Sequence, residues 1–136
     1  LRRNRWYSLR RNGWYTLHRN KWYSLDWNRW YSLGWNTQLL YKAEKLDQNN
    51  AEIYFLKGWV NNHFDYYDTA IIEINKAIKL KPNYPDAYYN RGFAKFQKND
   101  FIGALADYDI AIRLNPNFPE AIEDKRNLLI LMNQKT

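Results

Sequence analysis

The chain has 136 residues, which is long enough for one modest domain with its own hydrophobic core. It contains no cysteine, and this excludes disulfide frameworks, thiolate zinc sites and cysteine nucleophiles. No apolar run approaches the ~20 residues of a membrane-spanning helix, and no signal-peptide pattern is present. The cytoplasm is the working expectation for the compartment.

The charge is unevenly distributed along the chain. The formal net charge is +7, and the whole excess lies in residues 1–36, which contain eight Lys or Arg against one Asp. Residues 37–136 contain 13 basic and 13 acidic residues. Six of the seven tryptophans also lie in residues 1–36. We therefore predict a basic, aromatic, low-complexity segment over residues 1–34 and a second region over residues 35–136.

Residues 2–33 consist of four copies of an eight-residue unit, which read RRNRWYSL, RRNGWYTL, HRNKWYSL and DWNRWYSL. Eight residues at ~100° each leave successive copies of a helix ~80° out of phase, so a helix would have no aromatic face. An even period suits β-strands, and short WYSL strands separated by four-residue turns are one prediction. Irregular or predominantly disordered structure is the other.

The composition of these octads supports two functional interpretations. Arginine neutralises phosphates, and Trp or Tyr rings stack on bases or lie at a membrane interface, which predicts binding to nucleic acid or another anionic surface. Simple expansion of one copy of WYSLGWN explains the same repetition by composition alone. We favour the second interpretation and keep the first as the alternative.

The second region contains two copies of a 34-residue unit, residues 51–84 and residues 85–118, which align without a gap. In each copy, apolar residues recur at helical spacing in two stretches separated by a polar turn, and a proline follows. The expected helices cover residues 52–64, 67–80, 86–98 and 101–114. Eight positions are identical in the two copies: Tyr54 and Tyr88, Gly58 and Gly92, Ala70 and Ala104, Ala77 and Ala111, Ile78 and Ile112, Leu80 and Leu114, Pro82 and Pro116, and Asn83 and Asn117.

A partial copy lies on each side of this pair. Residues 35–50 place Ala43 and Leu46 in register with the end of a second helix. Residues 119–133 are expected to form a terminal helix. Because a single repeat cannot bury its apolar faces alone, these flanking copies are expected to complete the core.

This arrangement resembles the tetratricopeptide repeat family over about residues 35–136. The sequence departs from the family pattern at Lys57 and Arg91, where the family usually has leucine, and at Gln48, where it has proline. The resemblance implies an all-α fold, a right-handed solenoid of helix-turn-helix repeats. It also implies a non-enzymatic scaffold for a protein or peptide partner. The positions on which the resemblance rests are Tyr54, Gly58, Ala70, Ala77 and Pro82, and then Tyr88, Gly92, Ala104, Ala111 and Pro116.

In this family the first helices of successive repeats line a concave groove for a peptide or a helix. Trp59 and Phe93 suit a core position as well as a groove position, whereas Phe55 and Tyr89 are expected to be exposed. The peptide-binding residues that the resemblance implies are Phe55, Trp59, Asn62, His63, Tyr89, Phe93, Phe96 and Gln97.

Some family members hold the C-terminal carboxylate of a chaperone with lysine, arginine and asparagine. At the corresponding positions this chain has Phe55, Trp59, Asn90, Glu120 and Asp124, of which only Asn90 fits. Carboxylates at Glu120 and Asp124 would repel such a ligand. An apolar or amphipathic peptide is the favoured partner.

Neither an enzyme nor a bound cofactor or metal is expected. The two histidines, His18 and His63, have no evident catalytic partner in the sequence. A Gly-rich phosphate loop, a metal-spaced cluster and a nucleophile elbow are all missing from the sequence.

Overall fold

The computed structural model describes the backbone of residues 6–8, 14–18, 21–25 and 27–135, and the side chains of residues 37–135. It divides into two compact units, Leu1–Leu39 and Leu40–Thr136.

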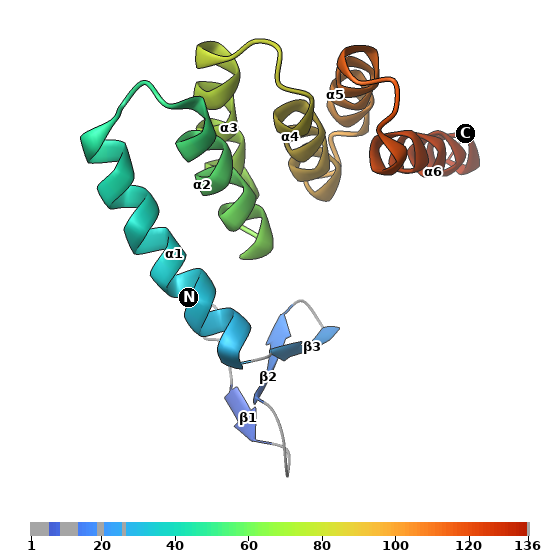
Figure 1. The fold of residues 1–136 in the computed structure, drawn as a ribbon. Helices are drawn as coiled ribbons and strands as arrows, with labels where there is room; N and C mark the ends of the chain where they lie inside the picture. The colour runs from blue at the N-terminus through green and yellow to red at the C-terminus, as the bar shows by residue number, and fades with distance from the viewer. Residues whose placement is uncertain (1–5, 9–13, 19–20, 26, 136) are drawn as a thin grey trace. The chain divides into compact units, whose positions relative to one another are not determined.

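The described residues form three strands and six helices (Figure 1). The strands are β1 (Trp6–Ser8), β2 (Trp14–His18) and β3 (Lys21–Leu25). The helices are α1 (Trp27–Leu46), α2 (Ala51–His63), α3 (Tyr67–Leu80), α4 (Pro85–Gln97), α5 (Phe101–Leu114) and α6 (Pro119–Gln134).

In the first unit, the three strands form one antiparallel sheet in the order β1-β2-β3. Each strand contains the WYS or WYT sequence of one octad, so the described residues adopt the strand alternative predicted for this segment. The arginine-rich stretches 1–5 and 9–13 lie outside the described residues. From Trp27 onward the fourth octad is helical, as part of α1. The predicted region boundary after residue 34 falls within this helix and stays a prediction.

The helix boundaries in the second unit follow from local chemistry, of which the prolines and the residues with positive φ repeat at a spacing of 34, while the side-chain caps do not. Asn50 and Asp100 cap α2 and α5, because their side chains accept hydrogen bonds from the backbone N–H groups of Glu52 and Gly103 at 3.0 Å. Helices α4 and α6 begin with proline, which lacks the N–H that a first turn leaves unpaired. Polar residues with positive φ follow α2 and α4, at Asp65 (61°) and Asn99 (64°).

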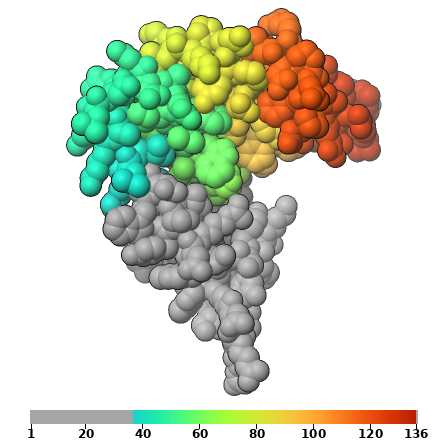
Figure 2. All heavy atoms as spheres, viewed as in Figure 1, coloured from blue at the N-terminus to red at the C-terminus, as the bar shows by residue number. Residues whose placement is uncertain are grey.

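Successive helices pack against each other from α2 to α6. The space-filling view shows their side chains in continuous contact (Figure 2). Close approach depends on small residues: Ala70 and Ala104 are fully buried, and a Cβ at Gly92 would lie 2.8 Å from the Tyr108 ring. At the equivalent Gly58, a Cβ would overlap the Ile74 side chain. The two glycines therefore set the spacing between the two helices of each repeat.

The predicted all-α repeat fold is confirmed for the second unit, whereas the first unit contains the three strands. The expected ranges 67–80 and 101–114 coincide with α3 and α5, and those expected for α2 and α4 are displaced by one residue. The terminal helix ends one residue later than expected, at Gln134. Within the described part of the chain, no helix has the length and apolar character needed to cross a membrane.

Candidate peptide-binding surface

All of the predicted site residues lie on α2 and α4, the first helices of the two complete repeats. These two helices contact each other directly, in addition to packing against α3. The faces of α2 and α4 that carry these residues are called the candidate surface.

Trp59 and His63 form the exposed aromatic part of this surface. The Trp59 side chain is 36% exposed, and its ring centroid lies 3.9 Å from that of His63. His63 is held in place because its Nδ1 lies 2.9 Å from the Trp59 carbonyl oxygen, one helical turn away. A large apolar ring thus remains accessible in a fixed position.

Phe55 and Tyr89 are half-buried, so the expectation that these two residues would be the exposed ones is wrong. Phe55 packs on Tyr84 with a centroid distance of 4.9 Å, and Tyr89 packs on Phe118 at 5.1 Å. Tyr84 and Phe118 occupy equivalent positions at the end of each repeat, immediately before the next first helix. In both repeats the equivalent aromatic residue of the first helix, Phe55 or Tyr89, is therefore partly covered by the aromatic residue at the end of the repeat.

Tyr89 is held more firmly than Phe55. Its hydroxyl donates a hydrogen bond of 2.8 Å to Oδ2 of Asp124, and its ring also lies 5.8 Å from that of Tyr108. Burial raises the pKa of Tyr89, and the hydrogen bond to Asp124 raises it further. Burial also raises the pKa of Tyr84 to about 12, with the charges of Glu52 and Asp86 acting in the same direction.

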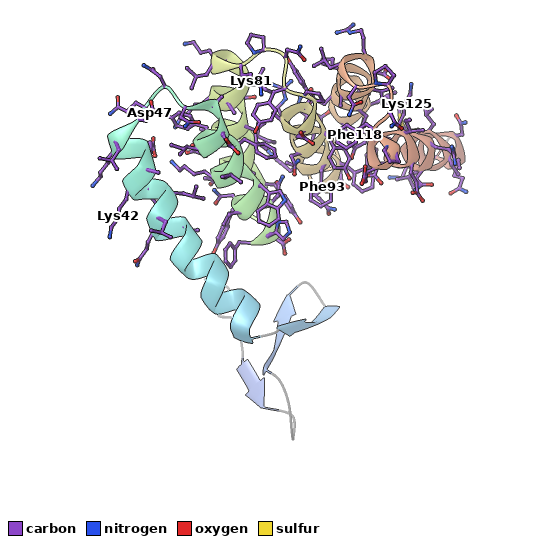
Figure 3. All side chains as sticks on the ribbon, viewed as in Figure 1. Lys42, Asp47, Lys81, Phe93, Phe118 and Lys125 are labelled. Carbon is purple, nitrogen blue, oxygen red and sulfur yellow. The ribbon has the colours of Figure 1, made fainter. Side chains whose placement is uncertain are left out.

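The remaining predicted residues have mixed environments. Phe93, which Figure 3 labels on α4, meets Tyr67 edge-on at 6.4 Å and is half-buried. Phe96 packs on Phe101 at 5.7 Å and against the buried cluster around Tyr108. Gln97, the last residue of α4, is half-buried.

Asn62 has a structural contact between the two repeats. It is only 5% exposed, and its Nδ2 donates a hydrogen bond of 3.0 Å to the Asn90 carbonyl oxygen. This bond joins α2 to α4 directly. Asn62 therefore helps to hold the two halves of the surface together.

Two of the residues at the carboxylate-clamp positions, Asn90 and Asp124, make hydrogen bonds within the chain. Asn90 donates its Nδ2 to the Asp86 carbonyl oxygen at 2.8 Å. Asp124 accepts the Tyr89 hydroxyl, and Glu120 is exposed. Two carboxylates thus lie where a clamp needs cations.

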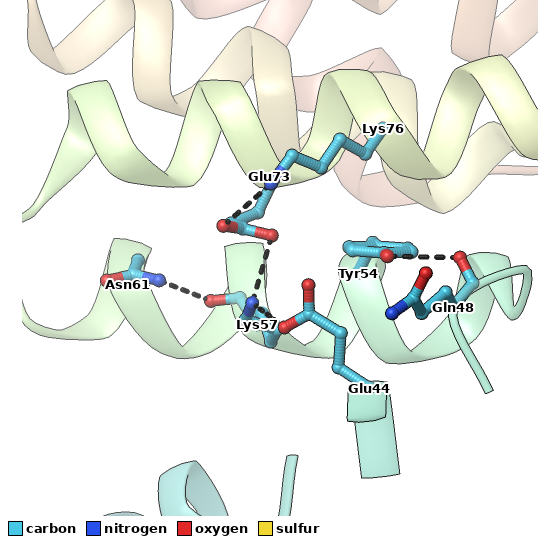
Figure 4. Close-up of polar contacts among 7 residues, drawn as sticks. All are labelled: Glu44, Gln48, Tyr54, Lys57, Asn61, Glu73 and Lys76. Atoms are coloured by element: carbon cyan, nitrogen blue, oxygen red, sulfur yellow. Dashed lines mark hydrogen bonds and ion pairs between the residues drawn. The ribbon is translucent and has the colours of Figure 1, made fainter. Parts of the chain in front are cut away.

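Buried ion pairs inside each repeat were missed by the sequence analysis. In the first repeat Lys57 is 6% exposed, and its Nζ lies 2.5 Å from Glu44 Oε2 and 3.3 Å from Glu73 Oε2 (Figure 4). The Glu73 contact lacks hydrogen-bond geometry, and Lys76 approaches the other Glu73 oxygen at 3.5 Å. The Tyr41 ring lies 4.6 Å from the same ammonium group.

These contacts change the pKa of both members of the closest pair. The hydrogen bond from Lys57 lowers the pKa of the Glu44 carboxyl, against a smaller opposing effect of burial. Burial by itself would lower the pKa of Lys57, but the hydrogen bond to Glu44 and the charge of Glu73 raise it overall. Both groups are therefore ionised near neutral pH.

The second repeat has the equivalent pair at Arg91 and Asp107. Asp107 is 2% exposed, and its Oδ1 lies 2.6 Å from Arg91 Nη2 while its Oδ2 lies 2.8 Å from Lys95 Nζ. Arg91 Nη1 also donates to Asn75 at 2.9 Å. The sequence signal was available: a cation replaces leucine at the same position of both repeats, and a carboxylate follows 16 residues later.

Among the residues that the structure describes, no group of three or more acidic or histidine side chains is placed to hold a metal ion. The surface offers aromatic rings, amides and carboxylates. These groups are suited to binding a peptide by contact and hydrogen bonding.

Comparisons with known proteins agree with this architecture. A family described as TPR repeat matches residues 66–99, and one described as Tetratricopeptide repeat matches residues 85–118. No curated protein matches the sequence.

Three solved structures illustrate the similarity in fold. The first TPR of Spaghetti (RPAP3), bound to the HSP90 peptide SRMEEVD, has 23% identity and a TM-score of 0.71 over 78% of this chain and 86% of that one. The Arabidopsis OM64 TPR domain has 22% identity and a TM-score of 0.70, over 74% and 84%. The MamA protein has 30% identity and a TM-score of 0.62, over 65% and 49%. With its helical repeats and the two family matches, this chain contains tetratricopeptide repeats, matched over residues 66–118.

Proposed function

We propose that the helical array is a non-enzymatic scaffold that binds a partner peptide or helix on the surface formed by α2 and α4. The observation that carries this proposal is the exposed Trp59 ring held against His63. Tryptophan is strongly enriched among the residues that dominate binding energy, because it provides a large contact area at low entropic cost. Phe55, Tyr89 and Phe93 provide half-buried aromatic edges on the same two helices.

The partner's chemistry follows from the polar groups around these rings. An acidic chain end such as that of SRMEEVD, the peptide bound in the RPAP3 structure, requires cations. At the clamp positions this chain instead has Phe55 and Trp59 on α2, and Glu120 and Asp124 on α6. Carboxylates there would repel the acidic end, so an apolar or amphipathic peptide is the proposed partner.

Peptide selection from a random phage-displayed library, with the full chain as target, tests this proposal. We expect apolar or amphipathic sequences, and we expect Trp59→Ala to weaken the selected peptides by at least about tenfold in fluorescence anisotropy. Tyr66→Ala is the matched control, because Tyr66 is another exposed aromatic residue, just before α3. Equal affinity for the wild type and Trp59→Ala would place the binding site elsewhere. Preferential binding of SRMEEVD would contradict the proposed partner chemistry.

A second candidate function rests on the +7 charge of residues 1–36 and on their six tryptophans. Such a segment is suited to nucleic acid or an acidic lipid surface. Binding of this kind is expected to weaken steeply with salt. Titration of a labelled single-stranded RNA at ~50 mM and ~200 mM NaCl checks it, and an affinity that does not depend on salt would contradict it.

A further inference from the structure

The three strands of the first unit show that the octad sequence pairs with itself. Strands β2 and β3 contain WYTL and WYSL and lie antiparallel, with Trp14 opposite Leu25 and Tyr15 opposite Ser24. Strand β1, from the first octad, pairs with the other edge of β2. One short sequence therefore supplies both partners of each strand pair.

Each edge of the sheet lacks a pairing strand within the described part of the chain. Strands β1 and β3 are its outer strands, and among the described residues no further strand pairs with either of them. An outer strand presents a row of backbone N–H and C=O groups that can pair with another chain. At five residues β3 is the longer of the two, against three for β1.

The octads pair in two different registers. The β1–β2 pair places Tyr7 opposite Tyr15, whereas the β2–β3 pair places Tyr15 opposite Ser24, one octad position further along. Strands without one fixed register are prone to alternative pairing and to exchange between chains. The octads therefore keep the capacity to pair with a strand of another chain.

We propose that the open edge of β3 pairs with β3 of a second copy of this chain, which joins two sheets into one six-stranded antiparallel sheet. Antiparallel pairing of a strand with its own copy is two-fold symmetric, which is the commonest symmetry of dimers. The second copy is the chosen partner because pairing between near-identical octads already occurs within the chain. This inference does not depend on the proposed peptide-binding surface.

Charge predicts an unusual salt dependence for this dimer. Residues 1–36 carry the whole excess of +7, so two such segments repel each other. Salt screens this repulsion, because the Debye length falls from about 14 Å at ~50 mM to about 4 Å at ~500 mM. The dimer is therefore expected to strengthen with salt. Association bridged by nucleic acid has the opposite dependence.

Sedimentation velocity on the nuclease-treated full chain tests the proposal at ~50 mM and ~500 mM NaCl, over about 10 to 200 µM protein. We expect monomer to predominate at low salt and dimer at high salt. Monomer under both conditions, or association that high salt abolishes, would overturn the proposal.

Two proline variants locate the interface. The N–H groups of neighbouring strand residues point to opposite edges, so of Tyr23→Pro and Ser24→Pro one removes a donor from the open edge and the other removes one from the β2–β3 ladder. Both are expected to abolish the dimer and to leave the helical circular dichroism of α2–α6 unchanged. Tyr66→Ser, at an exposed tyrosine of the array, is expected to leave the dimer intact. A dimer that survives both proline substitutions, or that Tyr66→Ser abolishes, would also overturn the proposal.

Discussion

The two complete repeats place a cation and a carboxylate at the same positions but balance them differently. At the first repeat, one cation, Lys57, lies between two carboxylates, Glu44 of α1 and Glu73 of α3. In residues 85–118, one carboxylate, Asp107, lies between two cations. The first network has a second carboxylate for its buried cation, whereas the two partly buried cations of the second network share a single buried carboxylate.

This difference explains how a cation is tolerated where the family usually has leucine. A buried charge is costly unless it is paired, and each repeat supplies the partner from its own second helix. The ion pair therefore links α2 to α3 and α4 to α5 at the same level as the glycine contacts. Its contribution to stability depends on how many partners remain when one is removed.

Removal of the shared carboxylate is expected to have the largest effect. Asp107→Ala leaves Arg91 and Lys95 without their common partner, and we expect it to lower the free energy of unfolding by about 3–5 kcal/mol. Glu73→Ala is expected to cost only about 1–2 kcal/mol, because Lys57 retains the closer carboxylate of Glu44. Urea unfolding of the full chain, followed by circular dichroism, measures both values.

Glu123→Ala is the control for this pair of variants, since Glu123 is exposed, and its effect is expected to stay within about 0.5 kcal/mol. Equal losses for Asp107→Ala and Glu73→Ala would contradict the difference between the two networks.

The glycine contacts are expected to have the next largest effect. Gly58→Ala and Gly92→Ala each place a methyl group against a packed neighbouring helix, which is expected to cost about 1–3 kcal/mol in urea unfolding. The two sites differ in one respect: a Cβ at position 92 would lie 3.1 Å from Cβ of Asp107, whereas that at position 58 meets Ile74. The added methyl group at position 92 is expected to displace the Asp107 carboxylate from Arg91 and Lys95. Because Asp107→Ala removes that carboxylate, a double-mutant cycle between Gly92→Ala and Asp107→Ala is expected to show coupling. Additive behaviour in this cycle would show that the glycine and the ion pair act independently.

A smaller difference between the repeats lies at the aromatic position of the surface. Tyr89 donates a hydrogen bond to Asp124, whereas the equivalent Phe55 has no hydroxyl and the residue equivalent to Asp124 is Asn90. Tyr89→Phe is expected to lower stability by about 0.5–1.5 kcal/mol in urea unfolding, the usual net value of one hydrogen bond. Phe55→Tyr is the reciprocal control and is expected to change stability by less than about 0.5 kcal/mol. A larger effect from Phe55→Tyr than from Tyr89→Phe would reverse this part of the comparison.

The fold could be predicted from the sequence because its determinants are local and periodic. The 34-residue spacing of Gly58 and Gly92, together with the prolines after the second helices, was sufficient to place α3 and α5. Exposure of the aromatic residues could not be predicted in the same way. It depends on where Tyr84 and Phe118 fold back, and a helical pattern contains no information on that.

The ion pairs could be predicted from the sequence only in part. Lys57 and Arg91 were visible as departures from the family pattern, but the pattern alone does not say which carboxylate approaches them. Glu44 belongs to α1, before the first complete repeat, so its contact with Lys57 depends on how α1 meets α2. The assignment of the eight predicted residues to peptide binding stays a prediction.

The smallest expected effect concerns the acid sensitivity of the first network, around Lys57 and Glu44. Lys57 lowers the pKa of Glu44 below its ordinary value of 4.5, so the folded state binds this proton less readily than the unfolded chain does. The stability from this pair is therefore present above about pH 4.5 and is lost as the pH falls through the lowered pKa. In Glu44→Gln this part of the acid-induced loss is expected to disappear, so that the urea midpoint falls less steeply from pH 5 to pH 3 than in the wild type. Because Glu44 is partly exposed, high salt is expected to reduce the difference. An unchanged slope in Glu44→Gln would contradict the contribution of the Lys57–Glu44 pair to the acid response.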